Sequence, residues 1–545
     1  MGKAKNIKAP AATRTLRWQE SFERITANII SVMVFVAFGF VAVMSLFQTS
    51  TLDPEKYVSE HILFVQDNLL VNLPLMGLFF MAVMAIGRKY NFFKRVNMTF
   101  MEVALVVYVL LFGLIWVLKV QSVPAADSAN IFYAASGAAK NDFTNMRSNS
   151  VFYNHDYYNN NSYFMFYPFQ LGFVFISELI YRIFGAETAL PLEIINVFCV
   201  AASYLGIAKI TRLLFKRRAT EFVAIILLIG CLQPILFTTF AYGNIMGMAF
   251  AIWASYFLIK YLQGGKWQLL IPSGILLVLS TLAKYNNMIY LIAFVIVLII
   301  HAVRNKKWQS IAFILAICVC AVGASKLVIA SYESRSGQKF TSGVSQTLYM
   351  DIGMQESYMA PGWYTDIGMK TFMNSGFDTK IANEKAKQDI DKRLKAFSSN
   401  LNYGAEFFSN KVLSQWNEPS YESIWVSKVK THYNGEPDPF VSSVYNKGLS
   451  KVLDFWFNIY MQALFLLFAG GIFVMLLKGK NNAAIILLPL VLLGAFGYHM
   501  IFEGKSQYIL TYIILMIPTA AWTAVTLMES KFNLLAKTKE DKYEN

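Results

Sequence analysis

The chain has 545 residues, of which 56% are hydrophobic and only 15% are charged. A soluble domain of this size carries roughly a quarter charged residues, so this composition excludes an ordinary soluble protein. The formal net charge is +15, but the basic residues gather in short segments between apolar runs, which is the positive-inside pattern of membrane proteins. We therefore interpret the charge as a sign of topology and of contact with membrane lipids, and we expect no nucleic-acid partner.

Apolar runs long enough to cross a bilayer recur along the chain, and they predict an all-α polytopic membrane protein with about 12–13 spans. The N-terminus is basic, and no cleavage site of small residues follows the first apolar run. That run is therefore predicted to be a retained signal anchor, with the N-terminus in the cytoplasm. The predicted spans are residues 25–47, 69–87, 98–119, 166–185, 189–214, 220–240, 246–263, 268–283, 286–303, 309–330, 455–478, 483–501 and 507–528.

Segment 166–185 is the weakest of these candidates, because it contains a proline, a glutamate and an arginine. If it crossed the membrane together with 189–214, the basic residues Lys216–Arg218 would lie outside, against the positive-inside rule. We therefore prefer an arrangement of about twelve crossings in which 166–185 is interfacial or re-entrant. In that arrangement Asp127 and the long polar stretch 331–454 share the extracytoplasmic face of a multi-pass cell-membrane protein.

Two polar stretches are long enough to be more than connections between spans. The first opens directly after the third span, and the second keeps Trp, Tyr and Phe throughout, as an ordered domain does. We divide the chain into an N-terminal tail with three spans (1–119), a first extracellular catalytic loop (120–165), a central membrane bundle (166–330), a late extracellular domain (331–454) and the C-terminal spans with a cytoplasmic tail (455–545).

Asp127 is the main candidate for catalysis. It stands close to the end of a predicted span, where a carboxylate is costly unless it has a task, a partner or water. The alternative is that Asp127 only caps a helix next to the membrane, together with Asn130.

The sequence contains five short motifs: Pro124-Ala-Ala-Asp127, Tyr167-Pro-Phe-Gln-Leu-Gly172, Ala241-Tyr-Gly-Asn244, Leu282-Ala-Lys-Tyr-Asn-Asn287 and Glu503-Gly-Lys-Ser-Gln-Tyr508. They resemble motifs of the GT-C superfamily, polytopic glycosyltransferases that take sugar from a polyprenyl-phosphate or polyprenyl-diphosphate carrier. The chain looks most like the bacterial, Gram-positive branch, which decorates cell-wall polysaccharides or teichoic acids. Two features depart from the pattern, namely Gln507 in place of an arginine and a pair of spans before the catalytic loop.

The resemblance implies a GT-C-like helix bundle and transfer of sugar to a cell-envelope glycan on the extracytoplasmic face. Such a reaction needs no nucleotide-binding loop, and one carboxylate near the acceptor hydroxyl suffices as general base. We predict an inverting single displacement with Asp127 as that base, because retention normally needs a second, nucleophilic carboxylate. Lys284 and Lys505 are candidates for binding the donor phosphate, although each could instead be a snorkelling lysine at a span end.

The remaining candidate residues concern the acceptor, the sugar and a metal ion. Glu503 is expected to hold the acceptor or assist the base, or else to pair with Lys505. No cofactor is certain, but His155 and Asp156 could bind a divalent cation. Four aromatic residues are expected to contact the acceptor or the sugar: Tyr167, Trp363, Trp416 and Tyr508.

Two other functions fit part of the pattern. A polysaccharide polymerase or ligase also combines many spans with one long outer loop, but such enzymes use Arg and His there, and His432 is the only histidine in that loop. A lipid-carrier flippase or transporter would need ionisable residues deep within several spans. Here the polar residues collect at one face, which favours the glycosyltransferase.

Overall fold

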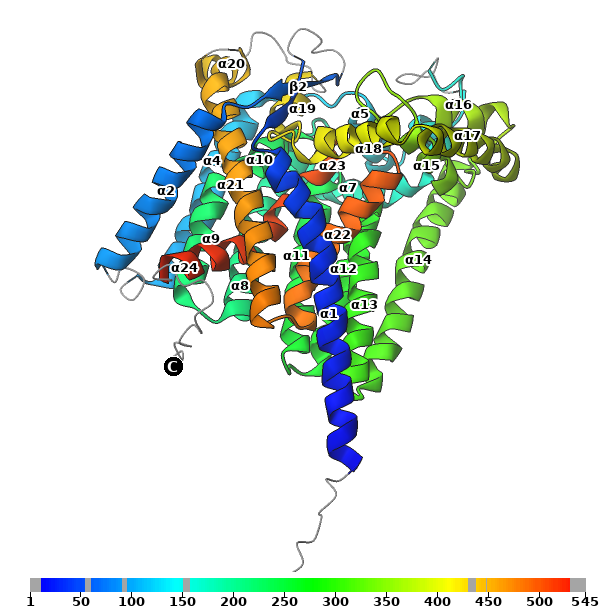
Figure 1. Cartoon of the computed structure of the whole chain (residues 1–545). Coiled ribbons are helices and arrows are strands. Elements are labelled where there is room, and N and C mark those ends of the chain that lie inside the picture. Colours follow the sequence, from blue (N-terminus) through cyan, green and yellow to red (C-terminus); the bar gives the residue numbers. More distant parts are fainter. Residues whose placement is uncertain are drawn as a thin grey trace, which may run out of the picture.

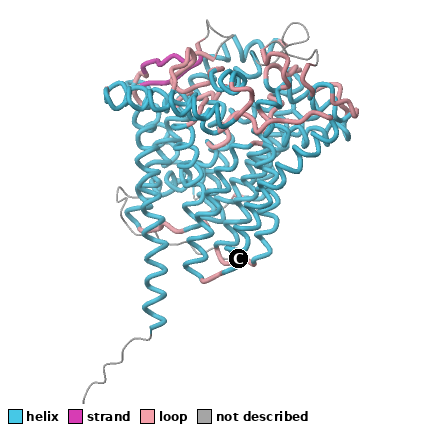
Figure 2. Tube along the Cα trace, turned by 90° about the vertical axis from the view of Figure 1, so that its right-hand side faces the viewer, coloured by secondary structure: helices cyan, strands magenta, loops and turns pink. Residues whose placement is uncertain are grey.

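The computed structural model describes residues 11–53, 60–90, 96–149, 157–429, 438–446 and 448–529. The regular secondary structure of this part is nearly all helical, with loops between the helices, as Figure 2 shows. The exception is a small antiparallel sheet of β1 (Gln48–Leu52) and β2 (Ile62–Gln66), in which Gln48 pairs with Gln66 and Leu52 with Ile62. The predicted all-α polytopic class is confirmed.

Eight helices of the described chain are long and apolar enough to cross a membrane, and α9 with α10 and η4 forms a bent pair that passes the same test together. Three further apolar segments are shorter, at Leu69–Leu78, Trp267–Ala283 and Ile513–Glu529. The long helices are α1 (Ala11–Met44), α4 (Met98–Val120), α8 (Leu190–Phe215), α11 (Asn244–Leu262), α13 (Met288–Asn305, preceded by η6, Tyr285–Asn287), α14 (Trp308–Ser336), α21 (Gly448–Lys478) and α22 (Ala483–Ile501). The others in the bundle are α2 (Leu69–Tyr90), α9 (Arg218–Gly230), α10 (Gln233–Leu236), η4 (Phe237–Thr239), η5 (Trp267–Leu269), α12 (Leu270–Ala283), η7 (Ile513–Met516) and α24 (Ile517–Glu529).

The segment predicted to be interfacial or re-entrant forms α7 (Leu171–Phe184), which is not among the helices long enough to cross. Its Glu178 is buried and accepts hydrogen bonds from Tyr332 and Arg335 of α14 and from Arg182. The charged residues that made this segment a weak span therefore hold α7 against the polar end of α14.

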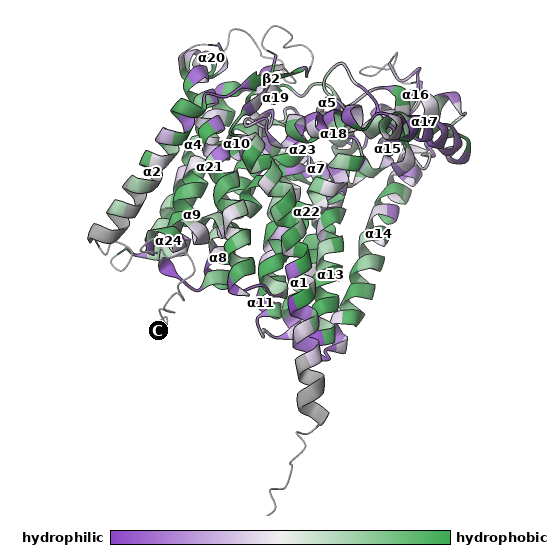
Figure 3. Cartoon of the chain, in the orientation of Figure 1, coloured by the Kyte–Doolittle hydropathy of each residue, from purple (hydrophilic) through white to green (hydrophobic). Residues whose placement is uncertain are grey.

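Polar helices cover one end of the bundle and form what we call the outer layer (Figure 1). Figure 3 shows that hydrophilic residues concentrate in this layer, most of all in α17, whereas the bundle beneath it is largely apolar. Two membrane helices extend further into this layer than predicted: α14 continues to Ser336 and α21 begins at Gly448. The outer layer consists of α15 (Gln346–Met354), α16 (Ile367–Asn374), α17 (Thr379–Ser399), α18 (Leu401–Trp416), α19 (Ser423–Val429) and α20 (Pro439–Asn446), together with α5 (Asp127–Ala139), η2 (Thr144–Met146), α6 (Tyr163–Phe166), η3 (Pro168–Gln170) and α23 (Ser506–Ile509).

The β1–β2 hairpin, which joins α1 to α2, rests on the outer layer. The backbone N–H of Ser50 donates to the carbonyl of Asn417 at 3.0 Å, and that of Ile62 donates to the carbonyl of Met359 at 2.9 Å. The side chain of Ile62 packs in a small apolar cluster with Met359 and Trp363. The hairpin thereby ties the N-terminal helices to residues about 300–370 positions later in the chain.

Basic residues mark the other end of the bundle. Helix α13 starts beside the outer layer, and Arg304 in its last turn pairs with Glu23 of α1. Helix α8 begins near the outer layer, where the Ser122 hydroxyl donates to the buried carboxylate of Glu193. The basic residues Lys216–Arg218 follow the other end of α8. The two basic segments Lys216–Arg218 and Arg304–Lys307 therefore lie at the end of the bundle away from Asp127.

Candidate active site

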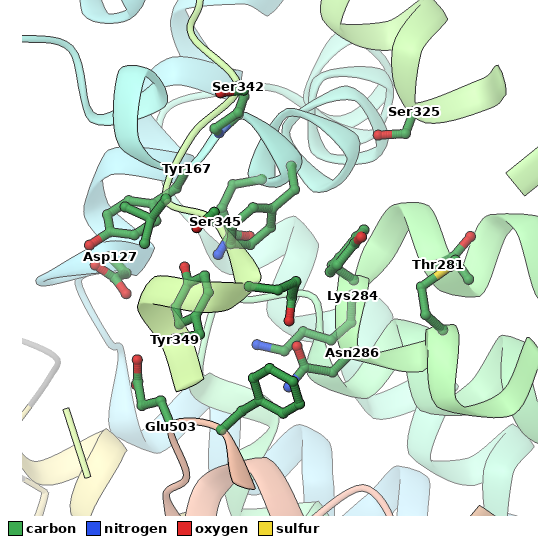
Figure 4. A pocket seen from close by; sticks show the side chains of 18 of the residues that line it. Asp127, Tyr167, Thr281, Lys284, Asn286, Ser325, Ser342, Ser345, Tyr349 and Glu503 are labelled. Atoms are coloured by element: carbon green, nitrogen blue, oxygen red, sulfur yellow. The ribbon is translucent and has the colours of Figure 1, made fainter. Parts of the chain in front are cut away.

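A cavity of about 470 Å³ lies between the outer layer and the bundle. A second cavity of about 290 Å³ adjoins it and shares Asp127, Lys284 and Glu503. In Figure 4, the side chains of Asp127, Lys284, Tyr349 and Glu503 point into the same space. The structure thus brings together candidates that are up to 376 residues apart in the sequence, and the wall of the larger cavity includes Asp127, Tyr167, Tyr242, Lys284, Tyr349, Glu503 and Tyr508.

Asp127 is the first residue of α5 and is exposed in the cavity wall. The residue before it, Ala126, has φ 51° and ψ −134°, a conformation that costs free energy for a residue with a Cβ atom. The N-terminus of a helix carries a partial positive charge, which stabilises the ionised carboxylate of Asp127. Ala126 is the N-cap of α5, and the Asn130 side chain donates to its carbonyl.

Lys284 is the single residue between α12 and η6. Its ammonium lies 4.3 Å from the ring centroid of Tyr242 and 5.3 Å from that of Tyr508, and both are cation–π contacts. The close approach of two chain breaks makes this placement possible, because a Cβ atom on Gly243 would lie only 1.8 Å from the carbonyl oxygen of Ala283. Lys284 is therefore held by aromatic faces inside the cavity rather than turned toward the membrane surface.

The segment between α22 and α23 supplies Glu503. Its backbone is fixed by two hydrogen bonds, from the N–H of Glu503 to the carbonyl of Tyr349 and from the N–H of Gly504 to the carbonyl of Gly362. The side chain is buried and accepts a hydrogen bond of 3.0 Å from the Tyr508 hydroxyl. Burial raises the pKa of Glu503, the nearby charge of Asp127 adds to this, and Lys505 opposes it.

Lys505 is paired with a residue that sequence reasoning missed. Glu60, which stands two residues before the start of β2, forms a buried ion pair with Lys505 beside the cavity. Burial would lower the pKa of Lys505, but the carboxylates of Glu60, Glu422 and Glu503 hold it above its ordinary value, so this lysine stays charged. Glu60 has no motif around it, and only the fold of the hairpin brings it here.

Tyrosine side chains form much of the cavity wall. Tyr167, a predicted sugar-binding residue, packs against Tyr163 with ring centroids 4.9 Å apart and ring planes tilted by 48°. Tyr364 lines both cavities, and its hydroxyl lies 2.5 Å from that of Tyr157. Burial raises the pKa values of Tyr163 and Tyr167 well above normal, and the charge of Asp127 contributes to both shifts. These tyrosines stay neutral, and their ring faces and hydroxyl groups suit a sugar.

One side of the cavity is formed by α14, which runs along the outside of the bundle (Figure 1). Only 17% of its apolar window is buried, against 61% for the window that contains α13. The part of α14 that lines the cavity carries Ser325 and Lys326 among apolar residues. Sequence reasoning missed Lys326, although a charged residue inside a predicted span was an available signal.

Two predicted acceptor-binding residues do not line either cavity. Trp363 is fully buried, and its indole N–H donates to the Ser414 hydroxyl at 2.8 Å. Trp416 is 1% exposed and packs edge-on against Phe38 of α1. Both residues are buried where the outer layer packs against its neighbours, because large aromatic rings contribute most to stability when they are buried. The structure does not support contact of either ring with an acceptor.

The predicted metal ligands His155 and Asp156 lie outside the described residues. Within the described ranges, no group of three or more His, Cys, Asp and Glu side chains could hold a metal ion. A divalent cation at His155 and Asp156 stays a prediction.

Residues 170–329 match the model of the dolichyl-phosphate-mannose-protein mannosyltransferase family. No curated protein shows significant sequence similarity to the chain. The solved structures that resemble it include the archaeal oligosaccharyltransferase AglB from Archaeoglobus fulgidus in complex with an inhibitory peptide and a dolichol-phosphate, with 14% identity, a TM-score of 0.40, and coverage of 78% of this chain and 50% of that one. Another is the Archaeoglobus fulgidus oligosaccharyltransferase tethered to an acceptor peptide, with 12% identity, a TM-score of 0.41, and coverage of 78% and 49%.

The chain spans about half the length of these oligosaccharyltransferases. The family match covers the α7–α14 part of the bundle, including the α12–η6 break that carries Lys284. It supports the predicted enzyme class, a membrane glycosyltransferase of the GT-C type.

Proposed function

We propose that the chain transfers a sugar from a polyprenyl-phosphate-linked donor to a glycan of the cell envelope, by an inverting single displacement with Asp127 as general base. The observation that carries this proposal is the cavity itself. It joins an accessible carboxylate, a lysine held between aromatic rings and an apolar side open along α14. A lipid-linked sugar phosphate needs all three features.

In this reaction one glycosidic bond forms and the bond between the sugar and the phosphate breaks. The acceptor hydroxyl oxygen attacks the anomeric carbon, Asp127 takes the hydroxyl proton, and the bond from that carbon to the phosphate oxygen breaks. The phosphate leaves with the electron pair, and the Lys284 ammonium compensates the negative charge that develops on it. Because attack comes from the side opposite the leaving group, the anomeric configuration inverts.

Asp127 suits the base better than Glu503 does. A base must be ionised and reachable by the acceptor, and Asp127 is exposed at a helix N-terminus. Glu503 is buried, has a raised pKa and is engaged by the Tyr508 hydroxyl. We assign Glu503 to orient the acceptor or Tyr508, and Tyr167 and Tyr508 to contact the sugar.

The donor lipid is expected to lie along α14. Its exposed apolar face would accompany the polyprenyl chain, and Lys326 and Lys284 would stand on the path of the phosphate. Lys505 is neutralised by Glu60, so we assign it to a secondary, positioning role at the phosphate.

The acceptor is expected to reach the cavity from the outer layer, on the extracytoplasmic face. The basic segments at the opposite end of the bundle support this orientation through the positive-inside rule. A cell-wall polysaccharide or teichoic acid of a Gram-positive bacterium is the proposed acceptor, on the motif resemblance.

The test is a transfer assay with purified wild-type protein and the Asp127→Asn variant, using lipid-linked sugars extracted from Gram-positive membranes. Asn keeps the size of the side chain but cannot take a proton, so we expect a loss of kcat of at least about 100-fold with unchanged donor binding. Glu503→Gln is the matched control, with a smaller loss expected. Equal activity of Asp127→Asn and wild type would refute the assignment of the base.

A further inference from the structure

A third cavity, of about 690 Å³, lies at the end of the bundle away from Asp127. It forms where α4 begins, α8 ends and α9 begins, with Tyr256 of α11 on one side. Helix α4 runs from this cavity toward the active-site end. Its 23 residues, at roughly 1.5 Å each, give a length of about 35 Å. The cavity is therefore distinct from the proposed active site, and the proposed function does not use it.

Four basic side chains line this cavity: Lys209 and Arg212 on the last turns of α8, Lys216 directly after it, and Arg218 at the start of α9. Lys216 can turn into the cavity because the chain reverses there, with φ 50° and ψ 36° at this residue. The sharp connection between α8 and α9 thus concentrates positive charge in one hollow rather than along a flat surface.

The carboxylates beside these cations neutralise them only in part. Lys209 pairs with Glu102 at 2.6 Å. The buried Glu221 lies 3.9 Å from Arg212, and both of its oxygen atoms lack a hydrogen-bond partner among the described residues. Arg218 donates to the carbonyl of Val96 at 2.7 Å. Lys216 forms no ion pair with a carboxylate of the described residues. The lining therefore keeps an excess of positive charge.

We propose that this cavity binds a phosphate group at the membrane boundary, held by Arg212, Lys216 and Arg218. Guanidinium and ammonium groups converging from two helix ends match the charge and the several acceptor oxygens of a phosphate. The side chains of Asn97 and Thr99 add neutral polar groups at the rim. Since the cavity lies at the end of membrane helices, the phosphate comes from an anionic lipid headgroup or from the aqueous phase, and the experiment separates these sources.

The experiment uses the full chain, purified and delipidated in detergent, with native mass spectrometry as the readout. The protein is titrated with phosphatidylglycerol, with phosphatidylcholine and, separately, with inorganic phosphate. The variants Lys216→Gln and Arg212→Gln each remove one cation. Lys306→Gln is the matched control, because Lys306 follows α13 in the same left-handed conformation, φ 53° and ψ 36°, but does not line the cavity.

We expect wild type and Lys306→Gln to retain phosphatidylglycerol over phosphatidylcholine, and each cavity variant to bind it about tenfold more weakly, as expected for the loss of a charged hydrogen bond. Competition by millimolar inorganic phosphate would identify the soluble ion as the ligand, and absence of competition would identify the lipid headgroup. No retention by the wild type, or an equal loss in Lys306→Gln, would overturn the site. Because Lys216 lies on the surface of a turn, its variant tests binding even if Arg212→Gln fails to fold.

Discussion

The buried ion pair between Glu60 and Lys505 yields the sharpest prediction about stability. The Glu60 side chain is 5% exposed and the Lys505 side chain 10%, and the pair joins the β1–β2 hairpin to the segment that carries Glu503. The substitution Glu60→Gln keeps the shape of the side chain but leaves the lysine charge buried without its nearest partner.

Removing one partner of a buried pair typically costs about 3–5 kcal/mol. Here the carboxylates of Glu422 and Glu503 also act on Lys505. They offset part of the loss, so we expect the free energy of unfolding to fall by about 2–3 kcal/mol in Glu60→Gln. Lys505→Met should cost a similar amount, since it strands Glu60 instead.

The assay is reversible unfolding in mixed micelles, applied as a double-mutant cycle of Glu60→Gln, Lys505→Met and the double variant. We expect the double variant to be more stable than the sum of the single losses predicts, by at least about 1 kcal/mol. The exposed pair Asp389–Lys392 is the control, and Asp389→Asn should change nothing measurable. Additive losses of less than about 1 kcal/mol each would refute the reasoning that this pair is buried and coupled.

Three further predictions follow from packing and burial. Gly243→Ala should destabilise the fold by about 1–3 kcal/mol or more and lower transfer activity, because the new Cβ atom would meet the Ala283 carbonyl and displace Lys284. Unfolding curves and donor binding measure the two effects. The control is Gly470→Ala, since the space around a Cβ atom at Gly470 is open. Trp363→Ala should lower the free energy of unfolding by about 3–5 kcal/mol and leave the acceptor KM of the folded fraction unchanged. A raised KM would instead indicate that Trp363 contacts the acceptor. Burial lowers the pKa of Lys411 to about 7 from 10.5. Between these pH values the unfolded state binds more protons than the folded state, so the free energy of unfolding should rise with pH from about 7 to 10.5. Unfolding curves measured over this range should show a flatter rise for Lys411→Met, and an unchanged slope would contradict the prediction.

Much of the candidate site could be read from short polar interruptions of apolar sequence. Lys284 follows α12 directly, Glu503 stands two residues after α22, and Asp127 stands seven residues after α4. Such residues are costly near a bilayer unless they have a partner or water. The structure brings all three to one cavity. Their roles in catalysis stay proposals, to be tested by the variants above.

The aromatic residues show where sequence reasoning fails. Trp363 and Trp416 stand in polar stretches, which suggested an accessible binding surface, but the hairpin and α1 cover them. Tyr167 and Tyr508, with equally ordinary neighbours, line the cavity. A ring is equally favourable in a core and against a sugar, so only the packing around it distinguishes the two.

The sequence by itself determined the class of protein, most of the apolar helices and the polar breaks between them, because these depend on local hydropathy and on the length needed to cross a bilayer. Only the tertiary structure decided that Glu60 reaches Lys505 and that Lys326 lines the cavity. These facts depend on contacts between residues tens to hundreds of positions apart. No local pattern records such contacts, since the free energy that selects them comes from burying apolar surface and pairing charge across the whole fold.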